Sequence, residues 1–334
     1  MSATATVLDA RPAGRLAQLL GYATRNGWTL GLVALLALLL VFTKLIQPSY
    51  GVPGIQGLAI SVLPLALAAV AQAIVVISGG IDLSVGSMMA LCSVISAFMM
   101  KGQSEEFGLA VVLGVILLGL VLGAVNGSLV VITRVPDIVV TLAMSYVWAG
   151  AALLVLKTPG GGSAKWLKDV VVGSLGSEWI PKAAVVLIVL VAIVWIPLRS
   201  SRFGLSIYAI GSNRLAAFRS GVPVSRTRIL AYVLAGLFAA LGGLSLTAST
   251  GIGTPVPGPY TLNSVAAVVL GGVSLAGGRG GAFGAIVAVM ILQLIRTDIT
   301  FLNINPNYAV VTQGAILIGV VMIGTLVQLR RSRA

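Results

Sequence analysis

The residue whose type and place most suggest a chemical role is Asp82, in the stretch SGGIDLSVGS. It lies between two long apolar runs, where an unpaired carboxylate is costly. Gly79 and Gly80 allow a tight turn ahead of it, and Ser84 follows two residues later. A carboxylate placed there can accept the free N–H groups of a helix that starts near Leu83. Asp82 therefore either caps a helix or contacts a solute, and the sequence leaves both open.

Other reactive side chains are scarce, which excludes most kinds of active site. The chain has no histidine and one cysteine, Cys92, which lies within an apolar run. A Ser-His-Asp set, a Cys/His metal site and a disulfide framework within the chain are therefore excluded. No G-x-x-x-x-G-K-[ST] segment occurs, so the chain cannot cradle ATP phosphates by a P-loop. We expect no catalytic residue, no metal and no cofactor, and hence no enzyme.

The composition is that of a membrane protein. The chain of 334 residues is 58% hydrophobic and 9% charged, with a mean hydropathy of +1.09, whereas soluble domains carry about 25% charged residues. Its net charge of +13 is spread over short loops between apolar runs. This distribution favours a positive-inside surface against lipid over a nucleic-acid partner.

The elements that must position Asp82 are membrane-spanning helices. We predict an all-α polytopic membrane protein with about ten transmembrane helices, since a span needs about 20 apolar residues. The candidate runs are 28–46, 58–78, 84–100, 108–128, 136–156, 182–198, 229–249, 263–276, 282–297 and 309–327. Several are short or broken, by Pro64, by Gly79-Gly80 and by Gly271-Gly272. Such breaks indicate a solute pathway or are ordinary features of membrane helices.

The basic residues set the orientation of these spans. With the N-terminus in the cytoplasm, most of them fall on the inner side, as the positive-inside rule requires. We therefore predict a cytoplasmic tail 1–27, a single transmembrane domain 28–327 and a cytoplasmic tail 328–334, with a retained first span. The polar stretch 199–228 lies inside and holds six arginines and no acid. The stretch 157–181 lies outside, and Gly160–Gly162 within it is a flexible connector.

The sequence resembles the ribose-type permeases of ABC importers, which serve ribose, xylose, arabinose, galactosides and related ligands. The signature residues are Gly79, Gly80, Ile81, Asp82, Leu83, Ser84 and Gly86, supported by GAVNG at 123–127 and PDIVVTL at 136–142. The resemblance implies a sugar-translocating subunit in the bacterial inner membrane. It also implies three partners: cytoplasmic ABC ATPase subunits, an extracytoplasmic solute-binding protein, and a second permease chain in a homodimer or heterodimer.

The stretch NRLAAFRSGV, residues 213–222, can form a short helix that ends near Gly221, where glycine suits a left-handed conformation. By resemblance this is the helix that couples the permease to the ATPase. Its matching residues are Asn213, Ala216, Ala217, Ser220 and Gly221. The family's acidic residue is absent, with Leu215 near its place, and Arg219 is displaced from the usual arginine. On the residues alone, the alternative is a solvated loop that binds anionic lipid.

Glycines four residues apart mark faces where membrane helices can approach closely. One face holds Gly119, Gly123 and Gly127, and two others are expected at Gly277 with Gly281 and at Gly280 with Gly284. Packing within the chain and contact between subunits are both open.

A sugar pathway needs convergent hydrogen-bonding groups. The possible pathway-lining residues are Gln72, Asn126, Thr141, Tyr146 and Asn263, with serines 78, 84, 87 and 145 beside them. The alternatives are an ABC permease for a branched-chain amino acid or a furanone signal, an ion-coupled secondary carrier, or a membrane enzyme. Ionisable residues deep in the spans are nearly missing, which disfavours the carrier.

Overall fold

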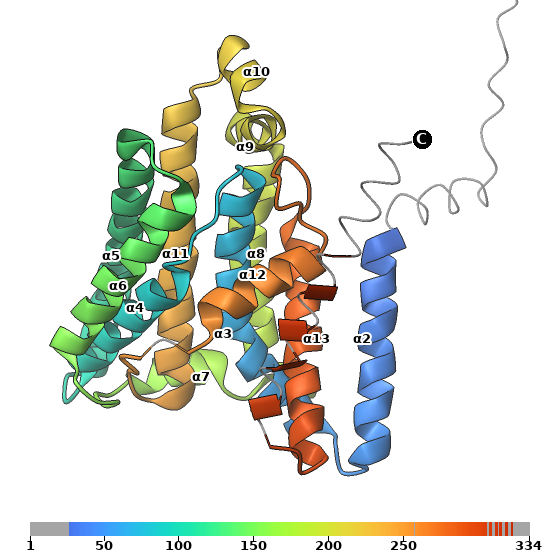
Figure 1. Ribbon diagram of the computed structural model, residues 1–334. Helices are drawn as coiled ribbons and strands as arrows, with labels where there is room; N and C mark the ends of the chain where they lie inside the picture. The colour runs from blue at the N-terminus through green and yellow to red at the C-terminus, as the bar shows by residue number, and fades with distance from the viewer. Residues whose placement is uncertain are drawn as a thin grey trace, which may run out of the picture.

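The computed structural model describes residues 27–256 and 258–305, with scattered positions up to 322. This part of the chain is almost entirely helical (Figure 1). In chain order the helices are α2 (Gly27–Ile46), α3 (Val52–Ile77), α4 (Val85–Met100), α5 (Glu105–Thr133), α6 (Asp137–Val155), α7 (Lys165–Val171), α8 (Lys182–Ser200), α9 (Arg202–Ser212), α10 (Arg214–Arg219), α11 (Val224–Thr250), α12 (Tyr260–Leu270) and α13 (Ala282–Phe301). The strands β1 (Ser174–Leu175) and β2 (Ser177–Pro181) lie between α7 and α8.

Within the described residues, seven helices are long and apolar enough to cross a membrane: α2, α3, α5, α6, α8, α11 and α13. The apolar helices α4 and α12 are shorter. Each of the first nine predicted runs corresponds to one of these helices. The tenth predicted run, 309–327, lies mostly outside the described residues, as do the predicted tails 1–27 and 328–334.

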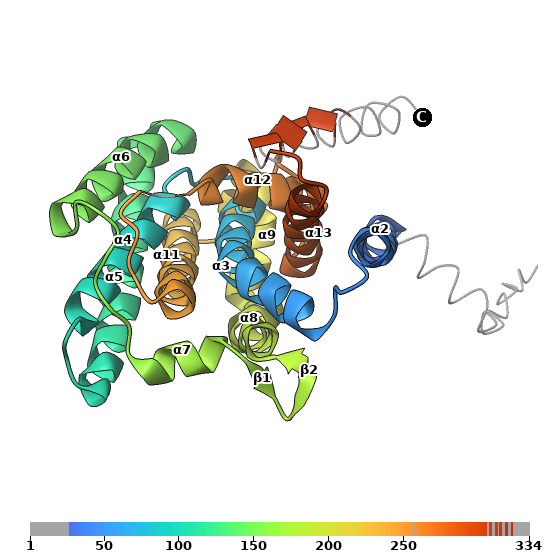
Figure 2. The same ribbon diagram turned by 90° about the horizontal axis from the view of Figure 1, so that it is seen from below.

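Helix α3 forms the centre of the molecule, as the view along the helices illustrates (Figure 2). It is apolar on all sides, and a helix of that kind must be enclosed by others. Every residue from 62 to 77 is buried, with α8, α11, α12 and α13 packed around it. The peripheral helices instead expose large apolar side chains, such as Leu38 of α2, Leu154 of α6 and Ile193 of α8. These exposed faces suit contact with lipid.

The glycine face on α5 packs against α11 of the same chain. A Cβ atom added at Gly119 or Gly123 would collide with the backbone of Gly236 or Tyr232. A Cβ atom at Gly127 would meet the backbone of Ile229, which is also on α11. Small residues therefore let α5 and α11 approach closely, which is how helices associate without a hydrophobic driving force in lipid. Packing within the chain is confirmed here.

The two other glycine faces are wrong as predicted. Gly277, Gly280 and Gly281 precede α13, which begins at Ala282. Gly277 and Gly280 have positive φ angles of 86° and 117°, which belong to a turn and not to a helix. Only Gly284 lies on a helix, where it packs against the backbone of Gly271.

The stretch 157–181 departs from the all-α prediction, since it holds α7 and the antiparallel pair β1–β2. Gly160 also exchanges two backbone hydrogen bonds with Gly253, of 3.0 and 2.8 Å, and the amide of Gly162 donates to Ala97 O at 2.9 Å. The expectation of a flexible connector at 160–162 is therefore wrong. These bonds tie the stretch to the ends of α4 and α11.

The basic stretch 199–228 is mostly helical. It comprises the end of α8, the short helices α9 and α10, and the start of α11. Figure 1 places α9 and α10 together at one end of the molecule and α7 at the other, and Figure 2, seen from that other end, shows the β1–β2 pair beside α7.

Candidate functional site

The break between α3 and α4 is built by two glycines with different tasks. Gly79 adopts a φ of +84°, and its amide donates to Val76 O at 2.9 Å, while Gly80 donates to Val75 O at 3.0 Å. This pair of bonds is the Schellman motif that ends a helix. Gly80 is needed for space, because a Cβ there would collide with a carboxylate oxygen of Asp137.

Asp82 is fully buried just after this turn. Its Oδ1 accepts hydrogen bonds from the backbone N of Ser84 at 2.8 Å and from Ser84 Oγ at 2.6 Å. Helix α4 begins at Val85, so the predicted start near Leu83 is two residues early. Asp82 therefore fixes the turn ahead of α4. Its Oδ2 has no partner among the described residues.

A chain of hydrogen bonds connects Asp82 to α5 and α6. Trp148 Nε1 donates to Asn126 Oδ1 at 3.1 Å, and Asn126 Nδ2 donates to Ser84 Oγ at 2.6 Å. Since Ser84 donates in turn to Asp82, four side chains share one buried network. Buried networks of this kind are rigid when they are satisfied and costly when one member is lost.

Two more predicted residues hold the backbone of the break. With its amide in the orientation that satisfies both polar atoms, Gln72 donates to Asp82 O at 2.8 Å and accepts from Asp82 N at 3.3 Å. Thr141 Oγ1 accepts from Leu83 N at 3.1 Å, and its proton can go to Ile81 O at 3.1 Å or to Asp137 O of its own helix at 2.8 Å. The polar groups of the break thus have partners on three helices.

The structure therefore brings Gln72, Asn126 and Thr141 together around Asp82. It leaves the other two predicted pathway residues apart. Tyr146 is 73% exposed on α6, and Asn263 is half-buried on α12. Contact of any of these side chains with a solute stays a prediction.

An ion pair that the sequence did not indicate lies beside the break. Arg228 Nη2 approaches Asp137 Oδ1 and Oδ2 at 2.6 and 2.5 Å, and Tyr232 OH donates to Asp137 Oδ2 at 2.9 Å. Asp137 does not cap α6, because Pro136 is the N-cap of that helix and the carboxylate faces α11. The one hint in the sequence was the position of Arg228 just before an apolar run, which does not identify its partner.

Helix α10 matches its prediction in detail. Asn213 Oδ1 accepts from the amide of Ala216 at 2.9 Å and caps the helix. Gly221 has a φ of +81°, and the amides of Gly221 and Val222 each donate to helix carbonyls at 3.0 Å. The left-handed glycine at the end of the helix is confirmed. Ala217 is buried, whereas Ala216 and Ser220 are exposed.

The exposed face of α10 combines apolar and basic side chains. Leu215 is 58% exposed and Phe218 is 64% exposed. Arg214 and Arg219 lie on the same short helix and are also exposed. Burial and the neighbouring charge of Arg228 lower the pKa of Arg214, while Asp137 acts in the opposite direction. The guanidinium remains charged at neutral pH, because arginine side chains do not lose their proton under physiological conditions.

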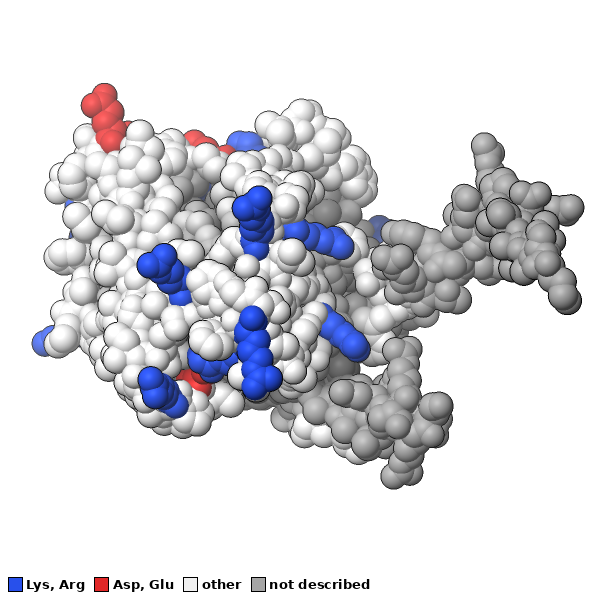
Figure 3. Space-filling view, turned by 90° about the horizontal axis from the view of Figure 1, so that it is seen from above, with Lys and Arg blue, Asp and Glu red and all other residues white. Residues whose placement is uncertain are grey.

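This end of the molecule is basic over a wide surface. Figure 3, seen from the side of α9 and α10, has many Lys and Arg side chains and few Asp and Glu. The exposed arginines of the stretch 199–228 include Arg199, Arg202 and Arg226.

Helix α9 links this basic end to both breaks in the helices. A Cβ at Gly211 would collide with Ile77 O at the end of α3 and with the amide of Gly278, in the segment between α12 and α13. That segment is bonded to α3 directly, since Gly278 N donates to Ile77 O at 2.9 Å. Three stretches of backbone therefore cross without side chains between them.

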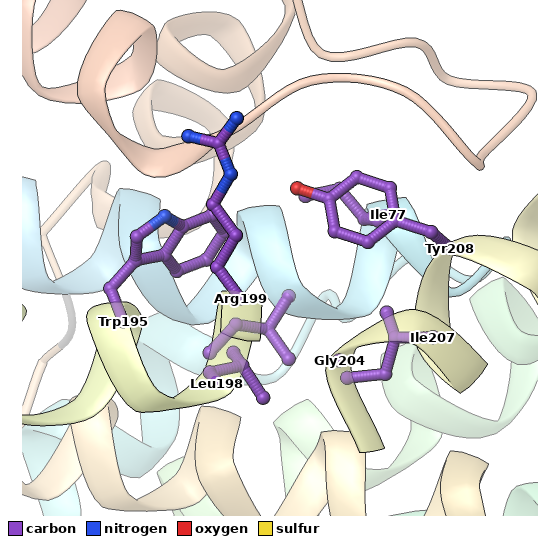
Figure 4. Close-up of a pocket in the computed structure, with 8 residues that line it drawn as sticks. Ile77, Trp195, Leu198, Arg199, Gly204, Ile207 and Tyr208 are labelled. Atoms are coloured by element: carbon purple, nitrogen blue, oxygen red, sulfur yellow. The ribbon is translucent and has the colours of Figure 1, made fainter. Parts of the chain in front are cut away.

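Tyr208 adds a side-chain link at the same crossing. Its hydroxyl donates to Gly280 O at 2.8 Å, and Figure 4 shows the ring over a small apolar crevice that Ile77, Trp195 and Ile207 help to line. Burial raises the pKa of Tyr208, and the charge of Arg199 works against this rise. The phenol therefore remains a hydrogen-bond donor at neutral pH.

Comparison with known proteins gives a consistent result. Residues 54–321 match the model of a family described as the branched-chain amino acid transport system / permease component. The chain is 34% identical to the ribose import permease protein RbsC of Bacillus subtilis (strain 168), over 86% of this chain and 90% of the relative. No solved structure matches.

Two further relatives carry other transport names. The galactose/methyl galactoside import permease protein MglC of Haemophilus influenzae is 33% identical over 75% of this chain and 80% of the relative. The autoinducer 2 import system permease protein LsrD of Escherichia coli O9:H4 is 28% identical over 92% of this chain and 95% of the relative.

Proposed function

The chain belongs to the permease family of sugar-type ABC importers, and from this premise we propose that it is the membrane subunit through which a monosaccharide enters the cell. The relatives that are 34% and 33% identical import ribose and galactose, by their names. It is a multi-pass inner-membrane protein. The proposal gives it about ten spans, of which the last, 309–327, lies outside the described residues.

We propose that the end bearing α9 and α10 faces the cytoplasm. The basic surface of Figure 3 supports this orientation, because cytoplasmic segments of membrane proteins carry an excess of Lys and Arg. Helix α2 starts at this end, and the even number of spans then returns the C-terminus to it. Both termini are cytoplasmic in this arrangement.

ATP hydrolysis belongs to separate subunits in this proposal. The sequence has no P-loop motif, and α10 offers a docking surface for an ATPase. Leu215, near the place of the family's acidic residue, and Phe218 are exposed on α10, with Arg214 and Arg219 beside them. An extracytoplasmic binding protein delivers the sugar at the opposite end, and a second permease chain completes the importer.

The single observation that carries the mechanism is the crossing at Gly211. A movement of α10 displaces α9, which lies next to it. Helix α9 contacts the backbone of both the 78–84 break and the 271–281 segment. Because these segments hold the ends of α3, α4, α12 and α13, a movement of α9 changes how those helices sit together. Alternating access then follows from movement of packed elements, in the manner of shear or hinge transitions.

An ABC permease for another solute is the second candidate. The LsrD relative imports autoinducer 2 by its name, and the matching family model carries the name of amino-acid transport. Both would use the same coupling surface. They differ from the first candidate only in the solute.

The test is a double variant, Leu215→Glu with Phe218→Glu, in the complete importer. Both side chains are more than half exposed, so the fold should persist. Ala217 is a poorer choice, because it is buried and a charge there would disrupt α10 itself. We expect normal membrane insertion, loss of ATPase co-purification and loss of ATP-driven D-ribose uptake.

The matched control is Leu215→Met with Phe218→Leu, which keeps the surface apolar and should keep uptake. Normal uptake in the double glutamate variant would refute coupling through α10. Uptake that survives removal of the ATPase would instead identify a secondary carrier.

A further inference from the structure

A polar groove lies at the end of the molecule opposite to α10. It is enclosed by the first half of α3, the C-terminal end of α11, the start of α12 and the second half of α13. Its volume of about 420 Å³ falls in the range of roughly 300–1,000 Å³ that small-molecule sites occupy. None of its polar residues was singled out as pathway-lining from the sequence.

The hydroxyl groups of the groove are presented as acceptors. Ser249 donates its proton to Leu246 O at 3.1 Å. The Thr250 hydroxyl has two carbonyls within reach, Leu246 O at 2.7 Å and Ile252 O at 2.9 Å, and it accepts from Ile252 N at 3.3 Å. Thr297 and Thr300 donate likewise to carbonyls of α13, at 3.0 Å each. Since Ser249, Thr297 and Thr300 donate to their own helices, both lone pairs of each oxygen are available to a ligand, and Thr250 keeps one. Ser61 of α3 is held in the same way.

Donors face these acceptors. Arg296 is exposed in the groove wall, and neither its guanidinium nor the hydroxyl of Tyr260 has a protein hydrogen-bond partner among the described residues. Gln293 is fixed from one side, because its Nε2 donates to Ser61 O at 2.8 Å. Its carbonyl oxygen remains free to accept.

The remaining wall is apolar and the lining is free of negative charge. Ile60, Pro64 and Leu246 form a smooth surface beside the ring of Tyr260. The described residues that line the groove include no carboxylate. A solute with a free ammonium group would therefore meet the charge of Arg296 with no compensating anion.

We propose that this groove is a binding site for a neutral polyhydroxylated solute at the outer mouth of the permease. Each hydroxyl of such a solute can donate to a Ser or Thr oxygen and accept from Arg296 or Tyr260, while its C–H faces lie on the apolar wall. A zwitterionic amino acid lacks this fit. The inference rests on the proposed function, to which it adds the place and chemistry of entry.

The experiment uses single cysteines in the complete importer in intact cells. Cys92 is buried and is the only native cysteine, so Cys92→Ser gives a thiol-free background. Ser249→Cys and Thr297→Cys then report the groove from two helices. Ser49→Cys, in the exposed connection between α2 and α3 at the same end, is the matched control. The probe is the membrane-impermeant anion methanethiosulfonate ethylsulfonate.

We expect all three cysteines to react from outside, with D-ribose slowing the reaction at the two groove positions only. At a D-ribose concentration about four times its dissociation constant, occupancy slows modification about fivefold. L-leucine at the same concentration gives no protection. Arg296→Gln in the Thr297→Cys chain keeps the reactivity and loses the protection.

Three results would overturn the site: groove cysteines that stay unreactive while Ser49→Cys reacts, no protection by D-ribose, or equal protection by L-leucine. Labelling requires no transport. If the importer shows no ATP-driven D-ribose uptake, the proposed function is contradicted and the groove is not. If D-ribose does not protect the groove cysteines from the reagent, the groove is contradicted and the proposed function is not.

Discussion

Arg228, which is buried, and Asp137, which is half-buried and lies 91 residues away in the chain, form an ion pair with N–O distances of 2.6 and 2.5 Å. It joins the start of α11 to the start of α6, next to the glycine turn that ends α3. Tyr232 contacts the same carboxylate from α11. The pair thus ties two spanning helices, α6 and α11, together beside the turn at the end of α3 that α9 contacts.

Replacing one residue of this ion pair should destabilise the protein more than replacing both. Arg228→Met leaves the half-buried carboxylate of Asp137 without its counter-ion, with only Tyr232 still donating to it. Loss of one partner of a fully buried pair costs about 3–5 kcal/mol, so a loss below that range is expected here. In the double variant Asp137→Leu with Arg228→Met, no charge is left, and the free energy of unfolding should recover most of that loss. Thermal unfolding in detergent measures both. Equal or additive losses would show that the pair is not coupled as its distances indicate.

Asn126→Leu should destabilise the break between α3 and α4. It removes the acceptor of Trp148 and the donor to Ser84 at once. Hydrogen bonds between membrane helices contribute about 0.6–2 kcal/mol each, so a loss of that order or slightly more is expected. Ser145→Ala is the control, because its hydroxyl is exposed and bonds only to its own helix. A stability of Asn126→Leu equal to that of Ser145→Ala would contradict the network.

Gly211→Val tests the three-way backbone crossing. A side chain there collides with the end of α3 and with the 271–281 segment, and overpacking of this kind costs about 1–3 kcal/mol. We expect ATP-driven D-ribose uptake to fall together with the unfolding temperature. Gly114→Val on α5 has open space around it and should leave both unchanged. Full uptake in Gly211→Val would show that α9 does not transmit the movement of the ATPase to the spanning helices.

The features that the sequence predicted correctly are local ones. Asn213 caps α10 by accepting from the amide of Ala216, three residues later, and Gly221 ends the helix in a left-handed conformation. A window of ten residues therefore contains all the information that specifies this helix. The Gly79-Gly80 turn and the apolar runs are equally local. For the same reason the face of Gly119 and Gly123 could be recognised from their spacing on one helix.

The features that were missed depend on tertiary placement. Nothing near Asp137 in the chain identifies Arg228 as its partner. The bridge between Gly160 and Gly253 joins segments 93 residues apart, and no local pattern marks it. The groove residues lie on four helices, and their hydroxyls look like ordinary helix serines and threonines until those helices are packed.

The central claim, that the basic end with α10 is cytoplasmic and the polar groove faces outside, is tested most directly by sidedness. Ser220→Cys in the Cys92→Ser chain places one exposed thiol at the end of α10. A membrane-impermeant maleimide should label it in inside-out vesicles and leave it unlabelled in intact cells, with Ser49→Cys giving the reverse pattern. Labelling of Ser220→Cys in intact cells would contradict the account.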